Sequence, residues 1–126
     1  MLNKVEHIGI AVKNLELANA LYAKMLGVSH YKIEEVASEN VRTSFFKVGD
    51  TKIELLEATS PKSAIAKFIE KRGEGMHHIA YAVENIEMAM QKLAQDGFRL
   101  LNEKPKKGAD NKLSLIHISE PTRRAI

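Results

Sequence analysis

Hydrophobic and polar residues alternate along this chain in a pattern that occurs twice. The segment HIGIAVKNLELANALYAKMLGV, which begins at His7, aligns without a gap to HIAYAVENIEMAMQKLAQDGF, which begins at His78. Each copy opens with a short apolar run that predicts a buried strand, and continues with apolar residues at helical spacing. The repeat therefore predicts two modules that share one local structure.

Residues at the expected helix ends support this prediction. Asn14 and Asn85 stand where a helix N-cap belongs, and a glutamate in each first turn favours the exposed amides there. Gly27 and Gly97 are typical of helix C-terminal ends. The apolar positions at helical spacing are Leu15, Ala18, Leu21, Tyr22 and Met25 in the first copy, and Ile86, Ala89, Met90 and Leu93 in the second.

The first copy predicts three more strands, over Tyr31–Val36, Val41–Val48 and Lys52–Glu57. A tight turn is expected at Gly49-Asp50. The segment Ser60–Gly75 predicts a linking helix that is capped by Ser60, with Pro61 at its first helical position.

The second copy has less room. FRLLNEKP predicts a strand that ends at a proline, KKGAD predicts a turn, and the remaining residues hold one further strand but not two. We therefore predict an α+β fold of tandem βαβββ modules with the second module truncated. The expected divisions are 1–58 for the first module, 59–74 for the linking helix, 75–112 for the incomplete second module and 113–126 for a tail.

Composition restricts the class of protein. The 126 residues suit one domain, and 44% apolar with 28% charged residues is typical of a soluble globular protein. No run approaches the roughly 18 apolar residues of a membrane span. With no cysteine and no leader pattern at the N-terminus, we expect a cytoplasmic protein. The net charge of +3 is dispersed, which argues against nucleic acid as a partner.

The repeat singles out two histidines. His7 and His78 occupy equivalent strand positions, so pseudo-symmetry allows their imidazoles to converge on one point. Adjacent strand residues face opposite ways, so His77 should point away from His78. The alternative is that each is a half-buried histidine bonded to backbone.

Glu54 is the third candidate. It lies in the apolar run DTKIELLEAT, where a buried carboxylate is costly without a partner. Coordination of a divalent metal by two imidazoles and this carboxylate would remove that cost. The alternative places Glu54 on an edge strand in water, but Glu57 breaks the alternation and is expected to be the solvent-facing acid. We therefore predict His7, Glu54 and His78 as metal ligands.

The same symmetry predicts a fourth ligand. Glu54 follows His7 by 47 residues, and 78 plus 47 gives position 125, which is Ala125. The only acid after Asp110 is Glu120, in a context that does not predict a strand. The symmetric partner of Glu54 is therefore missing.

Four segments together resemble the methylmalonyl-CoA epimerase family of the vicinal-oxygen-chelate, or glyoxalase-like, superfamily. They are EHIGIAVKNLELA, VGDTKIELLEAT, IAKFIEKRGEGMHHIAYAV and GFRLLNEKPKKGA, and the resemblance spans Lys4 to about Lys112. It implies two βαβββ modules in a cupped mixed sheet around one divalent metal ion of the Co²⁺ or Mn²⁺ class. His7, Glu54 and His78 match three of the family's ligands, and its C-terminal glutamate has no counterpart here.

The resemblance also implies an activity. The family interconverts (2R)- and (2S)-methylmalonyl-CoA by proton removal and return through a metal-stabilised enolate, and its superfamily commonly forms homodimers. One position proposed for proton transfer falls near Thr43, with Glu39 close by, so the catalytic residues are not assigned. The alternatives are another metal-dependent lyase or dioxygenase of this fold, or a metal-free small-molecule-binding protein.

The end of the chain looks foreign to this family. LSLIHISEPTR (Leu113–Arg123) is similar to the translation of a transposase adapter used in sequencing-library preparation. We therefore expect a non-native tail from Leu113 and an epimerase that is incomplete in this chain. The alternation in LSLIHI still suits a strand. His117, which lies in the tail, is left out of the predicted ligand set.

Overall fold

The computed structural model describes residues 2–101, 106–107 and 114–119. The chain forms two compact units, one of Ile8–His77 and one that joins Met1–His7 to the chain from His78 onward. Strands β1 (Leu2–Ala11) and β5 (Gly75–Val83) each contribute residues to both units. No helix within the described residues is long and apolar enough to cross a membrane.

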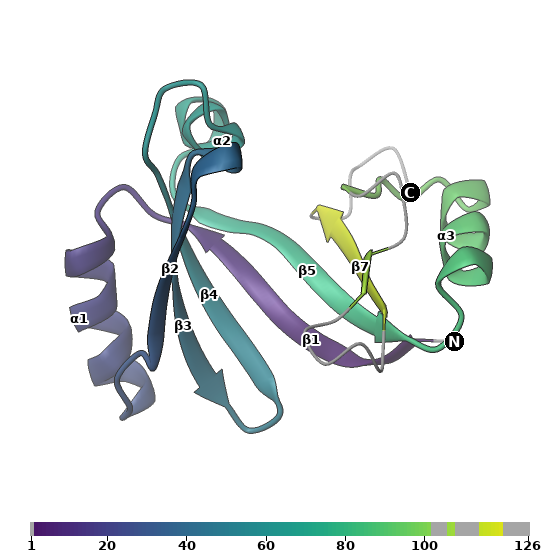
Figure 1. Ribbon diagram of the computed structural model, residues 1–126, viewed down its shortest axis with the longest axis horizontal. Helices are drawn as coiled ribbons and strands as arrows, with labels where there is room; N and C mark the ends of the chain where they lie inside the picture. Colours follow the sequence, from purple (N-terminus) through teal and green to yellow (C-terminus); the bar gives the residue numbers. More distant parts are fainter. Residues whose placement is uncertain (1, 102–105, 108–113, 120–126) are drawn as a thin grey trace. The chain divides into compact units, whose positions relative to one another are not determined.

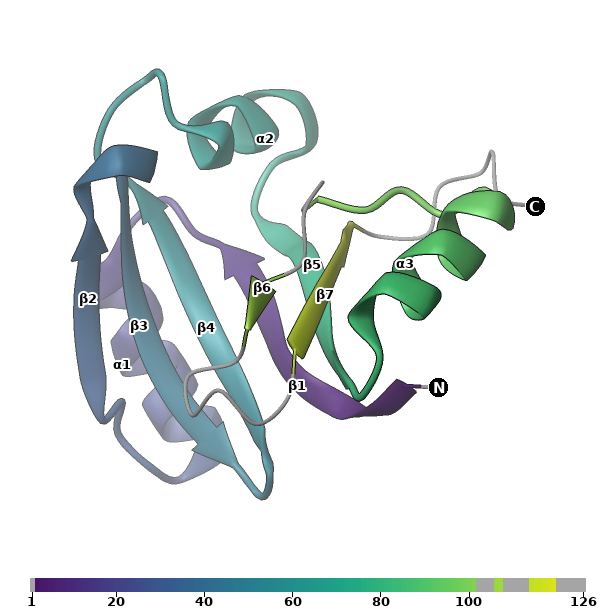
Figure 2. The same ribbon diagram turned by 45° about the vertical axis from the view of Figure 1, so that its right-hand side comes forward.

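The unit Ile8–His77 contains the complete strand–helix–strand–strand–strand pattern. Its strands lie in the order β2-β3-β4-β1, and β3 pairs antiparallel with both of its neighbours. Helix α1 lies against one face of these strands (Figures 1 and 2). The remaining elements are α1 (Leu15–Leu26), β2 (Lys32–Val36), a 3₁₀ turn (Ala37–Glu39), β3 (Val41–Val48), β4 (Thr51–Ala58) and α2 (Ala64–Arg72).

Alternation along β3 and β4 builds two cores in this unit. Leu15 of α1 packs with Phe46 and Leu55, whereas Leu56 packs with Val41 and with residues of α2. Leu55 and Leu56 point to opposite faces because they are adjacent on one strand. The sequence therefore needs both helices to cover the two apolar faces that it creates.

The predicted apolar face of α1 is confirmed at Leu15, Ala18 and Tyr22, which pack in the core, and is wrong at two other positions. Ala23 and Leu26 pack against the core beside Leu15. Leu21 and Met25, which the helical spacing placed on the apolar face, are 63% and 65% exposed. A stripe of apolar spacing thus predicts the helix but does not by itself select which residues contact the sheet.

The helix ends are mostly as predicted. The side chains of Asn14 and Asn85 accept hydrogen bonds from the N–H groups of Leu17 and Met88, each at 3.0 Å. Gly27 ends α1 with a φ of +75°, a conformation that a residue with a Cβ adopts at a cost.

The predicted cap of the linking helix is wrong. Ser63, not Ser60, caps α2 by accepting a hydrogen bond from the N–H of Ile65 at 3.1 Å. The Ser60 hydroxyl instead accepts from the N–H of Lys62, and the backbone closes a turn from Ser60 to Ser63. Both serines lie before apolar residues at helical spacing, and the local turn decides between them.

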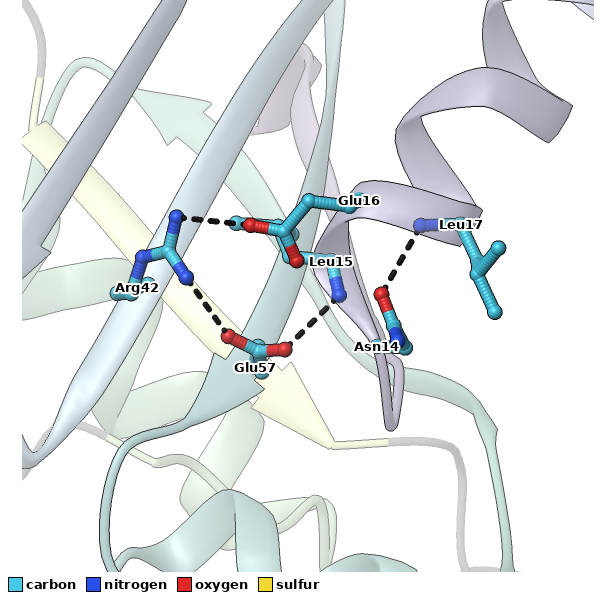
Figure 3. A network of polar contacts seen from close by, with 6 residues as sticks. All are labelled: Asn14, Leu15, Glu16, Leu17, Arg42 and Glu57. Carbon is cyan, nitrogen blue, oxygen red and sulfur yellow. Dashed lines mark hydrogen bonds and ion pairs between the residues drawn. The ribbon is translucent and has the colours of Figure 1, made fainter.

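Glu57 is also not the solvent-facing acid expected from the sequence. Its side chain is 18% exposed, and its carboxylate accepts hydrogen bonds from the N–H of Leu15 at 2.9 Å and from Arg42 at 3.2 Å (Figure 3). Arg42 also pairs with Glu16 at 3.3 Å. The carboxylate thus holds the positive N-terminal end of α1 against strands β3 and β4.

The second unit is built on β5, α3 (Ile86–Gln95), β6 (Lys106–Lys107) and β7 (Ser114–Ser119). Its strand order is β1-β5-β7-β6, and β7 pairs antiparallel with both neighbours. Of the predicted strand in FRLLNEKP, the structure describes residues 98–101, and within them Leu100 forms a single bridge with Ile118. The alternating segment LSLIHI does form a strand, and its Ile118 packs under α3.

The two units differ in the direction of their last strand relative to their first strand. In the unit Ile8–His77, β4 runs the same way as its neighbour β1 (Figure 2). In the other unit β7 runs antiparallel to β5. Among the described residues, three strands follow α1 but two follow α3, and with each hairpin reversing the chain, one strand fewer gives the final strand the opposite direction. The internal repeat is therefore not carried through to the last strand.

Replacement of Glu57 by Ala should destabilise the protein by about 2 kcal/mol, because the N–H of Leu15 and the guanidinium of Arg42 lose a charged acceptor. Glu16→Ala is the matched control, since this exposed partner of Arg42 should contribute about 0.5 kcal/mol or less. Urea denaturation measures both. Equal effects of the two substitutions would contradict the structural role given to Glu57.

Candidate metal centre

Two buried histidines meet in the second unit. His7, on β1, and His78, on β5, are 5% and 8% exposed. Their Nε2 atoms lie 3.0 Å apart, and their rings meet edge to face with centroids 5.1 Å apart. The equivalent positions of the repeat are thus brought together, as pseudo-symmetry predicts.

The neighbour of His7 orients its ring. The carboxylate of Glu6 lies 2.5 Å from His7 Nδ1, a distance at which the Nδ1–H group donates a hydrogen bond to the carboxylate. The other ring nitrogen of His7, Nε2, faces His78. A carboxylate behind the distal nitrogen is the usual way in which proteins fix a metal-binding imidazole. Strand alternation did not predict this contact, because Glu6 and His7 are adjacent.

A third imidazole lies beside this pair. The ring centroid of His117, on β7, is 5.2 Å from that of His7 and 5.4 Å from that of His78. The sheet register explains the placement, since His117 pairs with Ala80, two residues beyond His78. Residues that pair across two strands lie on the same face of the sheet, and so do residues two apart on one strand. His117 therefore lies on the same face of the sheet as His78.

His77 has a different environment from that of its neighbour His78. Its ring packs edge to face on Phe68 of α2, with centroids 4.9 Å apart. Burial lowers the pKa of His77 from its ordinary value, because the imidazolium loses hydration there. Packing against α2 therefore explains the position of the His77 side chain.

Glu54 lies in the other unit, on β4, where it is half-buried and pairs with Phe45 of β3. Thr43 lies two residues before Phe45 and is buried, so strand alternation places it on the same face as Glu54. Glu39 ends an exposed 3₁₀ turn. Ala125 and Glu120, which the symmetry argument considered, lie outside the described residues.

The histidine pair fits a divalent ion. Two ligand atoms at 2.0–2.1 Å from one ion, at angles of 90° to 110°, lie about 2.8–3.4 Å apart. The observed separation of the two Nε2 atoms falls in this interval. Neutral imidazoles in a largely buried site are ligands that divalent transition metals accept. The donor atoms, their burial and the carboxylate that contacts His7 together form a candidate metal centre.

Comparison with known proteins identifies close relatives. An ethylmalonyl-CoA/methylmalonyl-CoA epimerase of Cereibacter sphaeroides is 39% identical over 114 residues, covering 89% of this chain and 85% of that protein. The mitochondrial methylmalonyl-CoA epimerase of Bos taurus is 36% identical, covering 94% of this chain and 69% of that protein. A solved methylmalonyl-CoA epimerase in complex with methylmalonyl-CoA and NH₄⁺ has a TM-score of 0.75 at 25% identity, covering 96% of this chain and all of that one.

The family model described as Glyoxalase/Bleomycin resistance protein/Dioxygenase superfamily matches residues 6–114. The chain therefore belongs to that superfamily, whose vicinal-oxygen-chelate fold its α+β architecture displays. Identities of 36% and 39% over most of the chain narrow the assignment. Within the superfamily the chain is a member of the methylmalonyl-CoA epimerase family of isomerases.

Because burial lowers the pKa of His77, we expect the stability of the fold to depend on pH. Below about pH 6.5 the unfolded chain binds a proton that folded His77 takes up only at lower pH, so this contribution to stability falls as pH falls through that window. Phe68→Ala should expose the ring and raise its pKa toward the ordinary value, which NMR titration of the His77 imidazole would measure. A pKa unchanged by Phe68→Ala would show that burial against α2 is not the cause.

Proposed function

We propose that this chain catalyses interconversion of the 2R and 2S forms of methylmalonyl-CoA. The observation that carries the proposal is the buried pair of Nε2 atoms 3.0 Å apart, at equivalent positions of the internal repeat. The names of the relatives supply the substrate: two are epimerases of methylmalonyl-CoA, and one solved relative binds it. The substrate class is an acyl-CoA.

The chemistry needs an acidified C–H bond and two proton-transfer positions. The hydrogen on C2 lies between a thioester and a carboxylate, and its removal leaves a planar enolate. Return of a proton from the opposite side inverts the centre, so groups are needed on both sides of that plane. A divalent ion, when bound, would supply the positive charge that stabilises the enolate oxygen.

His7 and His78 have the role of holding that ion. The carboxylate of Glu6 contacts Nδ1 of His7, which leaves Nε2 as the ring nitrogen that faces His78 and would bind the ion. Burial of both rings excludes water that would compete for the same donors. We include Glu54 as a further ligand on grounds of sequence, since it matches the family's acidic ligand.

Proton exchange in this chain should be slow. The described residues of β6 and β7 include no acidic side chain, whereas the family uses a glutamate on its C-terminal strand. The acid and the base are left unassigned, and Thr43 cannot act as a base without a partner.

Substitution of either histidine tests the proposal. His7→Gln and His78→Gln should each slow the exchange of the C2 hydrogen of methylmalonyl-CoA for deuterium by at least about 10–100-fold, since even residues that only hydrogen-bond a metal ligand typically cost that much when replaced. ¹H NMR in D₂O measures this exchange directly. His30→Gln is the matched control, because His30 packs on Phe46 in the other unit.

Two outcomes would overturn the assignment. Exchange at equal rates in all four proteins would exclude a role for the histidine pair. Oxygen uptake with a catechol and no exchange of methylmalonyl-CoA would favour the dioxygenase alternative.

Assembly as a homodimer in the cytoplasm is part of the same proposal. Leu17, Leu21 and Met25 form an exposed apolar stripe along α1, at intervals of one turn, which a second copy could cover. We expect sedimentation equilibrium to give twice the chain mass of 14.1 kDa.

The double substitution Leu21→Lys and Met25→Lys should shift the protein toward monomer, whereas Met88→Lys on exposed α3 should not. This stripe would be excluded as the interface if the unchanged protein were monomeric. It would also be excluded if the protein with both Leu21→Lys and Met25→Lys remained a dimer.

A further inference from the structure

We propose that His7, His78 and His117 form a three-imidazole site for a divalent transition metal ion such as Zn²⁺, Co²⁺ or Ni²⁺. This inference deepens the proposed function and rests on it, since both assign the histidine pair to a metal ion. It adds a ligand from β7, a strand for which the family resemblance supplies no residue.

The first argument is the convergence of three strands. His7, His78 and His117 come from β1, β5 and β7, and one ring nitrogen of each lies within 4.8 Å of the others. His7 and His78 are buried and His117 is partly buried. Ligand atoms on one ion lie at most about 4.2 Å apart, so a small ring rotation would close the cluster.

The second argument is how β7 is held in place. Six consecutive residue pairs join β5 to β7, from His78 with Ser119 to Val83 with Ser114. On the opposite face, Ile118 is buried against Val83 and the residues of α3. Because Ile118 is fixed in the core, strand alternation fixes its neighbour His117 toward the histidine pair. A one-residue slip of β7 would remove both contacts together.

The third argument is that the small side chain of Ala80 leaves space for the His117 ring. Ala80 lies directly opposite His117 and is fully buried. Its methyl group leaves room for an imidazole on that face, whereas a larger side chain at position 80 would compete for the same volume.

The donor set selects the metal. Three neutral imidazoles suit Zn²⁺, Co²⁺, Ni²⁺ and Cu²⁺, whereas Mg²⁺ and Ca²⁺ prefer oxygen ligands. Three protein ligands leave positions open for a substrate oxygen, which a closed four-ligand site does not. The site should therefore bind the later transition metals and discriminate against Mg²⁺.

Titration of the untagged, metal-free chain of 126 residues with Co²⁺ tests the inference, because the visible spectrum of this ion reports its ligands. We expect one equivalent to bind. His117→Gln should weaken binding at least about 10-fold and change the spectrum. His117→Glu, which restores a donor atom, should recover affinity. His30→Gln, which removes an imidazole from the other unit, should bind as the unchanged chain does.

The inference and the proposed function fail in different ways. If His117→Gln retains the affinity and spectrum of the unchanged chain while Glu54→Gln loses affinity, the three-imidazole site is overturned and a metal-dependent epimerase stands. If the unchanged chain binds no Co²⁺, the metal part of both is overturned. If metal binds as inferred but no variant exchanges the C2 hydrogen, only the epimerase proposal fails.

A measurement on the unsubstituted protein avoids the requirement that each variant folds. Addition of Zn²⁺ to ¹⁵N-histidine-labelled protein should shift the imidazole signals of all three residues and leave that of His30 unchanged. A shift of the His7 and His78 signals alone would overturn the role given to His117.

Discussion

The contact between two buried imidazoles is the constraint on which the candidate site depends. His7 and His78 place their Nε2 atoms 3.0 Å apart where water has little access. The two ring nitrogens are close enough to share a hydrogen bond, and their separation also suits two ligands of one ion. Glu6 decides the tautomer on one side of the contact. Strands β1 and β5 thus hold the two Nε2 atoms close together before any ligand binds.

Much of this arrangement follows from the sequence. The internal repeat predicts equivalent positions for His7 and His78, and the two caps Asn14 and Asn85 set where the helices begin. Strands β3 and β4 follow from alternation and from the Gly49-Asp50 turn. These features are local or repeat-based, and local rules describe them well.

Other features depend on contacts between distant residues. Which serine caps α2 depends on a turn that the sequence permits in either place. Sequence alternation predicts that Glu57 faces water, but the fold brings Arg42 of β3 and the first turn of α1 to its carboxylate. Glu6 reaches His7 although alternation sends their Cβ atoms to opposite faces. The role of His117 depends on the register and direction of β7, which no repeat in the sequence specifies.

The reversed direction of β7 has a consequence for how this site could change. Strand β7 is held beside β5 by backbone pairing and by one apolar anchor, Ile118. Neither requirement specifies the residue that points toward the histidine pair. The third donor is therefore interchangeable in a way that the first two are not. A single codon could exchange nitrogen, oxygen or sulfur at that position while the strand, its register and the core beneath α3 stay as they are.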